Sequence, residues 1–347
     1  MTSQFEFQKR LGSGYFGEVW LAFDVGLGVY QAVKLISPSK VPNPKNIFQE
    51  SQILKSAENP NVVKVTSAGT LPDGQVYVAM EYLQRGSVDD ETKGGYLQLT
   101  RAKRLMIDVL RGLEHAHSKD ILHRDIKPAN ILIGESSEGK LSDFGLALPL
   151  SNLEYSIQNL KDYAYVYHQS PEVYSDRKYS IASDLYACGI TLYRLVNGDT
   201  YLPKIDNVDS LGEMITSGKF PKRDYYREFI PRSLKTVINK AMNLHPEDRN
   251  KSAQEMRHAL EQVFIDKNWI EKVLPNGVKW VCSWKEKKYY EVSRTQIGKS
   301  WSVIVRKGTS KNTARNDNQL SKTNLTQKEA KQLTQKILQG YVSGKLK

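Results

Sequence analysis

The most informative part of the chain reads His123-Arg124-Asp125-Ile126-Lys127-Pro128-Ala129-Asn130, and Asp143-Phe144-Gly145 follows it. Both runs place isolated acids or an amide beside short apolar stretches such as Ile131-Leu132-Ile133. This pattern is typical of buried strands that carry polar residues at their ends. Two carboxylates and an amide suit phosphoryl transfer, because one carboxylate orients the attacking hydroxyl while the other two groups hold Mg²⁺.

A glycine-rich stretch lies near the N-terminus and reads Gly12-Ser13-Gly14-Tyr15-Phe16-Gly17-Glu18-Val19. Dinucleotide-binding folds use a similar string of glycines, but there a helix follows it. Here the β-branched and aromatic run Val19-Trp20-Leu21-Ala22-Phe23 follows instead. We therefore expect the glycines to join two strands as a hairpin whose backbone a phosphate group can approach closely.

Together these motifs resemble those of the eukaryotic-type (Hanks-type) protein kinase family, Ser/Thr branch. The opening runs have the forms H-R-D-x-x-x-x-N and D-F-G, and Gln31-Ala32-Val33-Lys34 is similar to the family's V-A-I-K strand. Ser170-Pro171-Glu172 stands in the place of A-P-E. Asp184-Leu185-Tyr186-Ala187-Cys188-Gly189 resembles the central buried helix, and His245-Pro246-Glu247-Asp248-Arg249 a late loop. The motifs occur in the family's order, and the resemblance covers roughly residues 1–264.

The resemblance implies which residues act in catalysis. Asp125 would orient the acceptor hydroxyl and take its proton, and Lys127 would help to neutralise the transferred phosphoryl group. Lys34 would hold the α and β phosphates of the nucleotide. Glu50, which lies in a run with apolar residues at helical spacing, would fix Lys34 through an ion pair.

The resemblance also implies ATP and Mg²⁺ as cofactors, with Asn130 and Asp143 as the metal ligands. Adenine would hydrogen-bond to the backbone of residues 81–83, with Met80 as the gatekeeper. The residues expected to bind ATP are Leu11, Gly12, Gly14, Gly17, Val19, Ala32, Lys34, Met80, Glu81 and Leu83. Structural roles are implied for Asp184, which would hold the catalytic loop, and for an ion pair between Glu172 and Arg249.

Lys127 favours serine or threonine as the acceptor, because tyrosine-specific members of the family carry Ala or Arg near this position. However, Tyr165 stands where the Ser/Thr branch usually has a threonine, so dual or tyrosine specificity stays open. Arg124 beside Asp125 indicates control by phosphorylation of the activation segment, since this arginine would bind an anion. The candidate phosphosites are Ser151, Tyr155, Ser156, Tyr163, Tyr165 and Tyr167. Alternatively, these tyrosines simply pack the segment.

Length and composition fit a soluble globular protein. The 347 residues suggest about two or three domains, and the charged fraction of 25% is ordinary. No apolar stretch approaches the ~20 residues that span a bilayer, and no signal-peptide pattern is present. Only Cys188 and Cys282 occur, in a predicted helix and a predicted strand, so a disulfide framework is not expected. We therefore expect a cytoplasmic protein.

The positive charge is confined to the end of the chain. Residues 265–347 contain 18 Lys and Arg against 6 Asp and Glu, whereas the remainder holds 32 of each kind. Four of the five tryptophans also fall in residues 265–347, which is enough for a small core. The charge division therefore predicts a second module after the kinase-like part.

Strand-like alternation occurs in residues 278–284, 289–294 and 301–306 of this module, and residues 308–325 read as a polar loop. Thr326-Gln327-Lys328-Glu329 is a capping box that begins a helix. The apolar face of this helix would hold Ala330, Leu333, Ile337 and Leu338, and Gly340 would end it. We expect a three-stranded meander covered by one helix.

The basic module has several interpretations. It could be a docking or regulatory domain with a solvated basic face. It could instead bind nucleic acid or another polyanion, because basic charge with exposed aromatic residues is the expected footprint. Lys328-Glu329-Ala330-Lys331 after three strands resembles the double-stranded RNA-binding domain. An anionic membrane is less favoured, because no polybasic amphipathic helix stands out.

The expected fold is therefore α+β, with a bilobal kinase domain over residues 1–264, divided near residue 83, and an accessory β-β-β-α domain over residues 265–347. The expected function is ATP-dependent phosphorylation of serine or threonine in protein substrates, with autophosphorylation. The accessory domain would recruit substrates or partners. The alternative is a nucleotide-binding signalling scaffold that acts through a nucleic-acid-binding C-terminal domain. It is less favoured, because degenerate relatives usually lack one of the catalytic residues that are present here.

Overall fold

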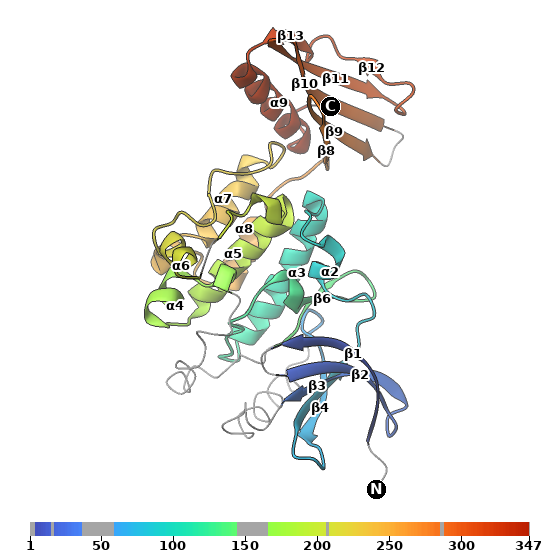
Figure 1. Cartoon of the computed structure of the whole chain (residues 1–347), viewed down its shortest axis with the longest axis vertical. Coiled ribbons are helices and arrows are strands. Elements are labelled where there is room, and N and C mark those ends of the chain that lie inside the picture. The colour runs from blue at the N-terminus through green and yellow to red at the C-terminus, as the bar shows by residue number, and fades with distance from the viewer. Residues whose placement is uncertain are drawn as a thin grey trace.

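The computed structural model describes residues 4–14, 17–36, 59–143, 166–205, 208–284 and 288–346. A β-sheet lobe, a helical lobe and a C-terminal sheet domain follow one another along the long axis of the molecule (Figure 1). The predicted α+β architecture with two lobes and an additional C-terminal sheet domain is confirmed. No helix in the described ranges is long and apolar enough to cross a membrane.

The N-terminal lobe is an antiparallel sheet with the strand order β1-β2-β3-β5-β4. The β1–β2 hairpin closes with Gly14 opposite Gly17, as the glycine-rich stretch predicted. A Cβ atom at Gly17 would lie 1.7 Å from the carbonyl oxygen of Leu35, so glycine is required where the hairpin meets β3. The strands of this lobe are β1 (Phe5–Gly14), β2 (Gly17–Asp24), β3 (Val29–Ile36), β4 (Val65–Thr70) and β5 (Val76–Glu81).

The helical lobe is built around α5, which is buried along residues 183–197. This helix contacts α3, α7, α8 and three 3₁₀ helices, which cover its apolar side chains and its few polar ones. The helices of this lobe are α2 (Val88–Thr92), α3 (Leu99–His117), α4 (Pro171–Asp176), α5 (Ile181–Asn197), α6 (Val208–Thr216), α7 (Arg232–Ala241) and α8 (Ala253–Glu261).

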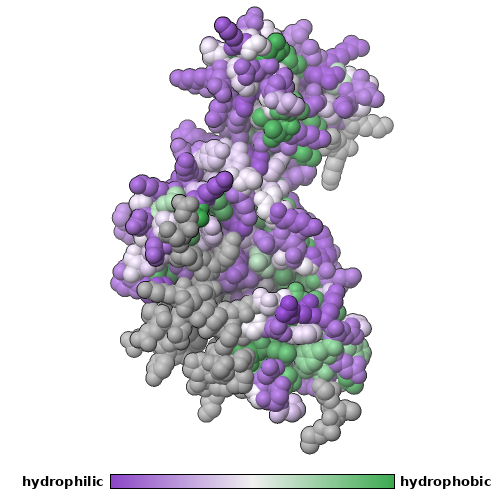
Figure 2. Space-filling model, viewed as in Figure 1, coloured by the Kyte–Doolittle hydropathy of each residue, from purple (hydrophilic) through white to green (hydrophobic). Residues whose placement is uncertain are grey.

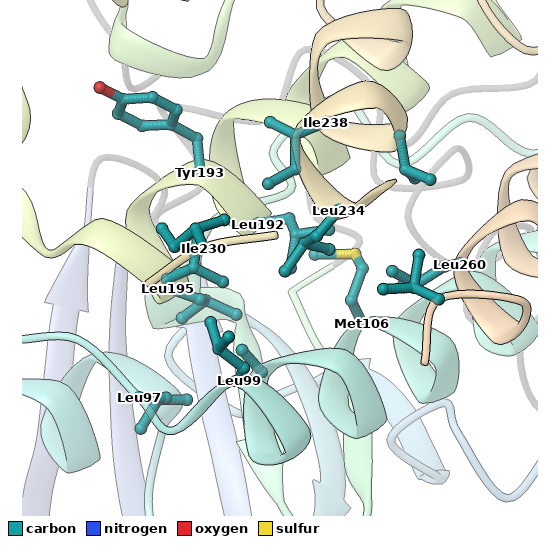
Figure 3. Close-up of a cluster of buried hydrophobic side chains, with 14 of the residues drawn as sticks. Leu97, Leu99, Met106, Leu192, Tyr193, Leu195, Ile230, Leu234, Ile238 and Leu260 are labelled. Atoms are coloured by element: carbon teal, nitrogen blue, oxygen red, sulfur yellow. The ribbon is translucent and has the colours of Figure 1, made fainter. Parts of the chain in front are cut away.

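The lobe also contains the short strands β6 (Ile131–Ile133) and β7 (Gly139–Leu141) and the 3₁₀ helices η2 (Pro128–Asn130), η5 (Val166–His168), η6 (Asp199–Tyr201) and η7 (Pro246–Asp248). β6 and β7 pair with each other beside α3. Figure 3 shows the core between the helices, where the side chains of Leu99, Met106, Leu192, Leu195, Leu234, Ile238 and Leu260 gather.

The C-terminal domain is a six-stranded sheet in the order β12-β11-β10-β9-β8, with β13 also paired to β11. One helix, α9, packs against β10, β11 and β13. The elements are β8 (Ile270–Leu274), β9 (Gly277–Trp284), β10 (Lys288–Ile297), β11 (Ser300–Gly308), β12 (Arg315–Asn316), β13 (Lys322–Leu325) and α9 (Gln327–Val342).

Two predictions for this domain need correction. The three expected strands are present, but β8 precedes them, and β12 and β13 lie in residues 308–325, which were expected to be a loop. These added strands are short or polar and belong to the sheet only through their pairing with β9 or β11. Gly340 does not end α9, which continues to Val342; a Cβ atom at Gly340 would lie 2.8 Å from the Leu346 side chain, so the glycine makes room for the chain that folds back.

Polar and aromatic groups join the helical lobe to the C-terminal domain. The guanidinium of Arg227 lies 3.9 Å from the ring centroid of Tyr96 and 4.8 Å from that of Tyr201. It also donates to Glu271 at 2.6 Å, while the backbone N–H of Glu271 donates to the Tyr96 hydroxyl at 2.7 Å. A second ion pair joins Arg294 of β10 to Glu228 at 2.6 Å. Because the hydrophobic core also runs through both units, the domain is fixed to the lobe.

We expect Arg227→Ala to lower the free energy of unfolding by about 2–3 kcal/mol, because it leaves the mostly buried carboxylate of Glu271 without its cation. Urea unfolding would measure the change. Lys240→Ala is the matched control, since the Lys240–Glu255 pair is 44% and 41% exposed and should contribute under ~1 kcal/mol. Equal unfolding midpoints for the two variants would show that the Arg227 junction adds no stability.

Candidate active site

The catalytic loop brings three predicted residues together between α3 and β6. Lys127 Nζ donates to Asp125 Oδ2 at 2.7 Å. Asn130 Nδ2 donates to the same Oδ2 at 2.9 Å and to the backbone carbonyl of Asp125 at 2.8 Å. Burial raises the pKa of Asp125, and the neighbouring Lys127 charge lowers it only in part. The loop therefore presents a carboxylate held by an ammonium group and an amide.

Asp184 at the start of α5 fixes the backbone of this loop. Its carboxylate accepts from the backbone N–H of His123 at 2.9 Å and from that of Arg124 at 2.8 Å. Arg124 needs this support, because its φ of 67° lies in the left-handed region that a non-glycine residue rarely adopts. Asp184 therefore connects the start of α5 to two backbone N–H groups of the catalytic loop.

The sequence interpretation missed the role of His117, which lies at the C-terminal end of α3. Its Nε2 atom is 2.9 Å from Asp184 Oδ2. Although burial raises the pKa of Asp184, the hydrogen bond and charge of His117 outweigh that effect, and the net pKa is lowered. The only signal in the sequence is a histidine six residues before His123, which does not point to a partner 67 residues away.

Lys34 on β3 reaches Asp143 directly and forms an ion pair with its carboxylate. Burial raises the pKa of Asp143, but the charge of Lys34 more than offsets this effect, and the net pKa is lowered. Asp143 adopts a left-handed φ of 60° just after β7, a conformation that a non-glycine residue rarely takes. The expected partner of Lys34, Glu50, lies outside the described residues, so their ion pair stays a prediction.

The residues expected to surround adenine lie on adjacent strands of the N-terminal lobe. Ala32 on β3 is opposite Met80 on β5 in the ladder, and Val19 is opposite Lys34. The N–H of Glu81 donates to the carbonyl of Lys64 at 2.9 Å, and the Glu81 carboxylate pairs with Lys140 at 2.8 Å. An adenine contact at Glu81 would therefore have to use its backbone carbonyl.

The structure also brings Glu172 and Arg249 together. The guanidinium donates to both carboxylate oxygens, at 2.7 and 2.8 Å, and the Arg249 side chain is completely buried. Of the candidate phosphosites, only Tyr167 is described, and its ring centroid lies 5.6 Å from that of Phe220. The other candidates, Ser151, Tyr155, Ser156, Tyr163 and Tyr165, lie outside the described residues.

Comparison of the chain with protein-family models agrees with this geometry. The model for the protein kinase domain matches residues 5–264. The chain belongs to the protein kinase family. Serine/threonine-protein kinase STE20 of Saccharomyces cerevisiae is 31% identical over 72% of this chain and 26% of its own length. A kinase of Arabidopsis thaliana, SNF1-related protein kinase catalytic subunit alpha KIN12, is 32% identical over 65% of the chain and 46% of its own length.

A bacterial relative is also similar: a probable serine/threonine-protein kinase of Clostridium perfringens is 30% identical over 77% of this chain and 39% of its own length. This chain therefore spans between about a quarter and a half of the length of these relatives. The similarity carries the fold and the family, whereas acceptors and partners must be argued from the residues of this chain.

Proposed function

We propose that this member of the protein kinase family transfers the γ-phosphate of ATP to serine or threonine hydroxyls of protein substrates. The observation that carries the proposal is the convergence of Asp125, Lys127 and Asn130 in one loop, close to the Lys34–Asp143 pair. Positioning and charge stabilisation account for most of the catalysis of phosphoryl transfer, and these residues supply both. Phosphoamino-acid analysis after reaction with a generic basic protein would test it. Absence of phosphoserine and phosphothreonine would refute the assignment.

In the proposed reaction, Asp125 accepts a hydrogen bond from the acceptor hydroxyl and takes its proton as the bond to phosphorus forms. The raised pKa of Asp125, caused first by burial, makes the carboxylate a better proton acceptor than an exposed aspartate. Lys127 lies on the same carboxylate oxygen, where its charge can also meet the transferred phosphoryl group. This arrangement favours serine or threonine over tyrosine.

Asn130 and Asp143 fit a magnesium site. Asn130 uses its Nδ2 group to bond Asp125, which leaves its carbonyl Oδ1 for a cation. Oxygen ligands from an amide and a carboxylate are those that Mg²⁺ prefers. When bound, the metal would neutralise phosphate charge, and Lys34 would exchange part of its contact with Asp143 for phosphate oxygens.

The β1–β2 hairpin and the strands below it would bind ATP. The backbone of residues 12–17 would cover the phosphates, since Gly12 leaves open space where another residue would place a side chain. Leu11, Val19 and Ala32 would contact the adenine ring, with Met80 beside them, and Leu83 would contribute a backbone group.

The two cysteines, Cys188 and Cys282, are buried free thiols, which supports the expectation of a cytoplasmic protein.

The rate should fall at acidic pH as Asp125 becomes protonated, because only its ionised form accepts the proton. The raised pKa of Asp125 places this fall above the range of an ordinary aspartate. Lys127→Ala removes a positive charge that lowers this pKa, so the acid limb should move to higher pH. A pH profile of kcat for both proteins would measure the shift. An unchanged or lower apparent pKa in Lys127→Ala would contradict the proposed coupling.

Arg124 would couple activity to phosphorylation, because a guanidinium beside the catalytic aspartate can bind a phosphate group through charge-assisted hydrogen bonds. The Arg124 guanidinium lies 5.3 Å from the Tyr179 ring centroid. We expect active enzyme to have autophosphorylated between Ser151 and Tyr167, and phosphatase treatment to reduce its activity. Mass spectrometry with parallel rate measurements checks this. Full activity in protein that is unmodified over these residues would contradict it.

We further propose that residues 1–264 form the catalytic unit and residues 265–347 an accessory unit that recruits partners. The end of the family match at residue 264 and the separate sheet of the C-terminal domain support this division. The junction at Arg227 and Glu271 suggests that truncation at residue 264 costs stability, so recruitment is better tested in the full chain.

A further inference from the structure

The acidic side chains that the structure describes in the C-terminal domain all have interaction partners. Glu271 pairs with Arg227, Asp317 with Lys307, and Asp266 with Lys267. Glu291 lies 3.6 Å from both Lys279 and Arg306, and Glu329 accepts from the Thr326 backbone in the capping box. Four of these five described carboxylates have a cationic partner, and Glu329 is held by hydrogen bonds in the capping box. The domain therefore keeps an excess of basic residues that these acids do not pair.

Five of these basic residues form what we call the distal basic surface: Lys311, Arg315, Lys322, Lys328 and Lys331. All five are exposed, and none has an ion pair with a described carboxylate. They come from the β11–β12 connection, β12, β13 and the first turns of α9. Figure 1 shows β12 and β13 at the end of the domain away from the two kinase lobes.

The residues between these cations are polar and uncharged. Exposed amides and hydroxyls include Asn312, Asn316, Asn318, Gln319, Thr323, Asn324 and Gln327. No large apolar side chain is exposed among residues 308–331, and Figure 2 shows hydrophilic side chains around much of the margin of this domain. A protein partner usually needs buried apolar or aromatic anchors, and a membrane surface needs an apolar face. Lysine, arginine, amide and hydroxyl groups are instead the usual donors to nucleic-acid phosphates.

The burial of the described aromatic residues indicates which kind of nucleic acid, duplex or single strand, the domain could bind. The sequence suggested basic charge with exposed aromatic residues, but Trp269, Trp280, Tyr290 and Tyr341 are all buried. They form the core against α9, where the ring centroids of Tyr290 and Tyr341 are 5.1 Å apart. Single-strand binding relies on bases stacked on exposed rings, which these four residues cannot provide. Trp301 is half-buried, and the Trp284 side chain lies outside the described part of the chain.

We propose that the distal basic surface binds duplex nucleic acid through its sugar–phosphate backbone, without dependence on base sequence. The shared chemistry is the duplex phosphate backbone, whether of RNA or of DNA. Because the junction at Arg227 and Arg294 fixes this domain to the helical lobe, a bound duplex would hold nucleic-acid-associated substrates at a defined distance from the catalytic loop. Binding itself does not depend on the proposed phosphoryl transfer.

Binding of the full chain to a labelled 20-base-pair duplex of RNA or DNA, without ATP, tests the proposal. The triple variant Lys322→Gln, Lys328→Gln and Lys331→Gln should bind at least about tenfold more weakly near 0.1 M salt. Its plot of log affinity against log salt should be flatter by about 2–3 units, since each phosphate contact contributes roughly 0.9 to the slope. Kinase activity toward a generic substrate should be unchanged in this variant.

The matched control is Lys119→Gln, Lys219→Gln and Lys272→Gln, which removes the same charge from exposed lysines elsewhere. It should change affinity by less than about twofold. Equal weakening by both triple variants would overturn the assigned surface, because net charge alone would explain binding. Failure to bind a duplex at low salt would overturn the proposal, as would tighter binding to a single strand, to polyglutamate or to phosphatidylserine vesicles. RNA and DNA arms then identify which duplex is preferred.

Discussion

Asp125→Ala should lower phosphoryl transfer by about 10²–10⁴-fold while ATP affinity stays nearly unchanged, because the carboxylate acts on the acceptor hydroxyl and not on the nucleotide. Asp125 is mostly buried and is held by Lys127 and Asn130, so its removal takes away a positioned proton acceptor. The measurements are kcat on a peptide substrate and nucleotide binding by calorimetry. The expected loss lies in kcat, with little change in nucleotide Kd.

The matched control is Asp120→Asn, which alters an exposed aspartate five residues upstream and should leave kcat unchanged. Asp125→Asn separates charge from shape, since it keeps the size of the side chain but cannot accept the proton, and it should be impaired like the Ala variant. A variant lacking the Asp125 carboxylate that phosphorylates at the normal rate would contradict the assigned role.

Arg249→Ala should destabilise the kinase domain by about 3–5 kcal/mol, because it leaves the Glu172 carboxylate without its buried cation. The lost guanidinium also bonds the backbone carbonyls of Asn243, Ala182 and Leu244, at 2.7, 3.0 and 3.1 Å. These hydrogen bonds connect Arg249, at the end of η7, with α5 and with the segment that follows α7. Their loss would loosen the lobe that carries the catalytic loop. Urea unfolding followed by circular dichroism measures the change.

The matched control for this variant is Arg10→Ala, which breaks an ion pair with Glu18 whose side chains are 55% and 44% exposed. That change should cost less than ~1 kcal/mol. If Arg249→Ala fails to fold, Arg249→Lys gives a second reading, because it keeps the charge but loses the bidentate geometry and should fall between the other two. A loss for Arg249→Ala no larger than that of Arg10→Ala would contradict the structural role.

The catalytic loop was predictable because its residues are close in sequence. Asp125, Lys127 and Asn130 lie within six positions, so the geometry of one loop and of η2 brings them together. Contacts across long separations were not visible from spacing alone. The Lys34–Asp143 ion pair spans 109 residues, and the sequence interpretation paired Lys34 with Glu50 and did not predict this contact.

The C-terminal domain was predictable only in part, for physical reasons. Its central strands alternate apolar and polar residues, and that period is visible in the sequence. β12 and β13 are short, polar edge strands whose backbone pairing with β11 leaves no such pattern. The junction of Arg227 with Tyr96, Tyr201 and Glu271 depends on four distant segments and carries no local signal.

The central claim is most directly tested by following the γ-phosphate itself. The full chain would be incubated with γ-labelled ATP and a generic protein substrate, with and without Mg²⁺, while nucleotide binding is measured in parallel. We predict that label appears on serine or threonine of the protein only when Mg²⁺ is present. ATP that binds with ordinary affinity, but whose label never leaves the nucleotide for protein, would contradict the claim and favour a nucleotide-binding scaffold.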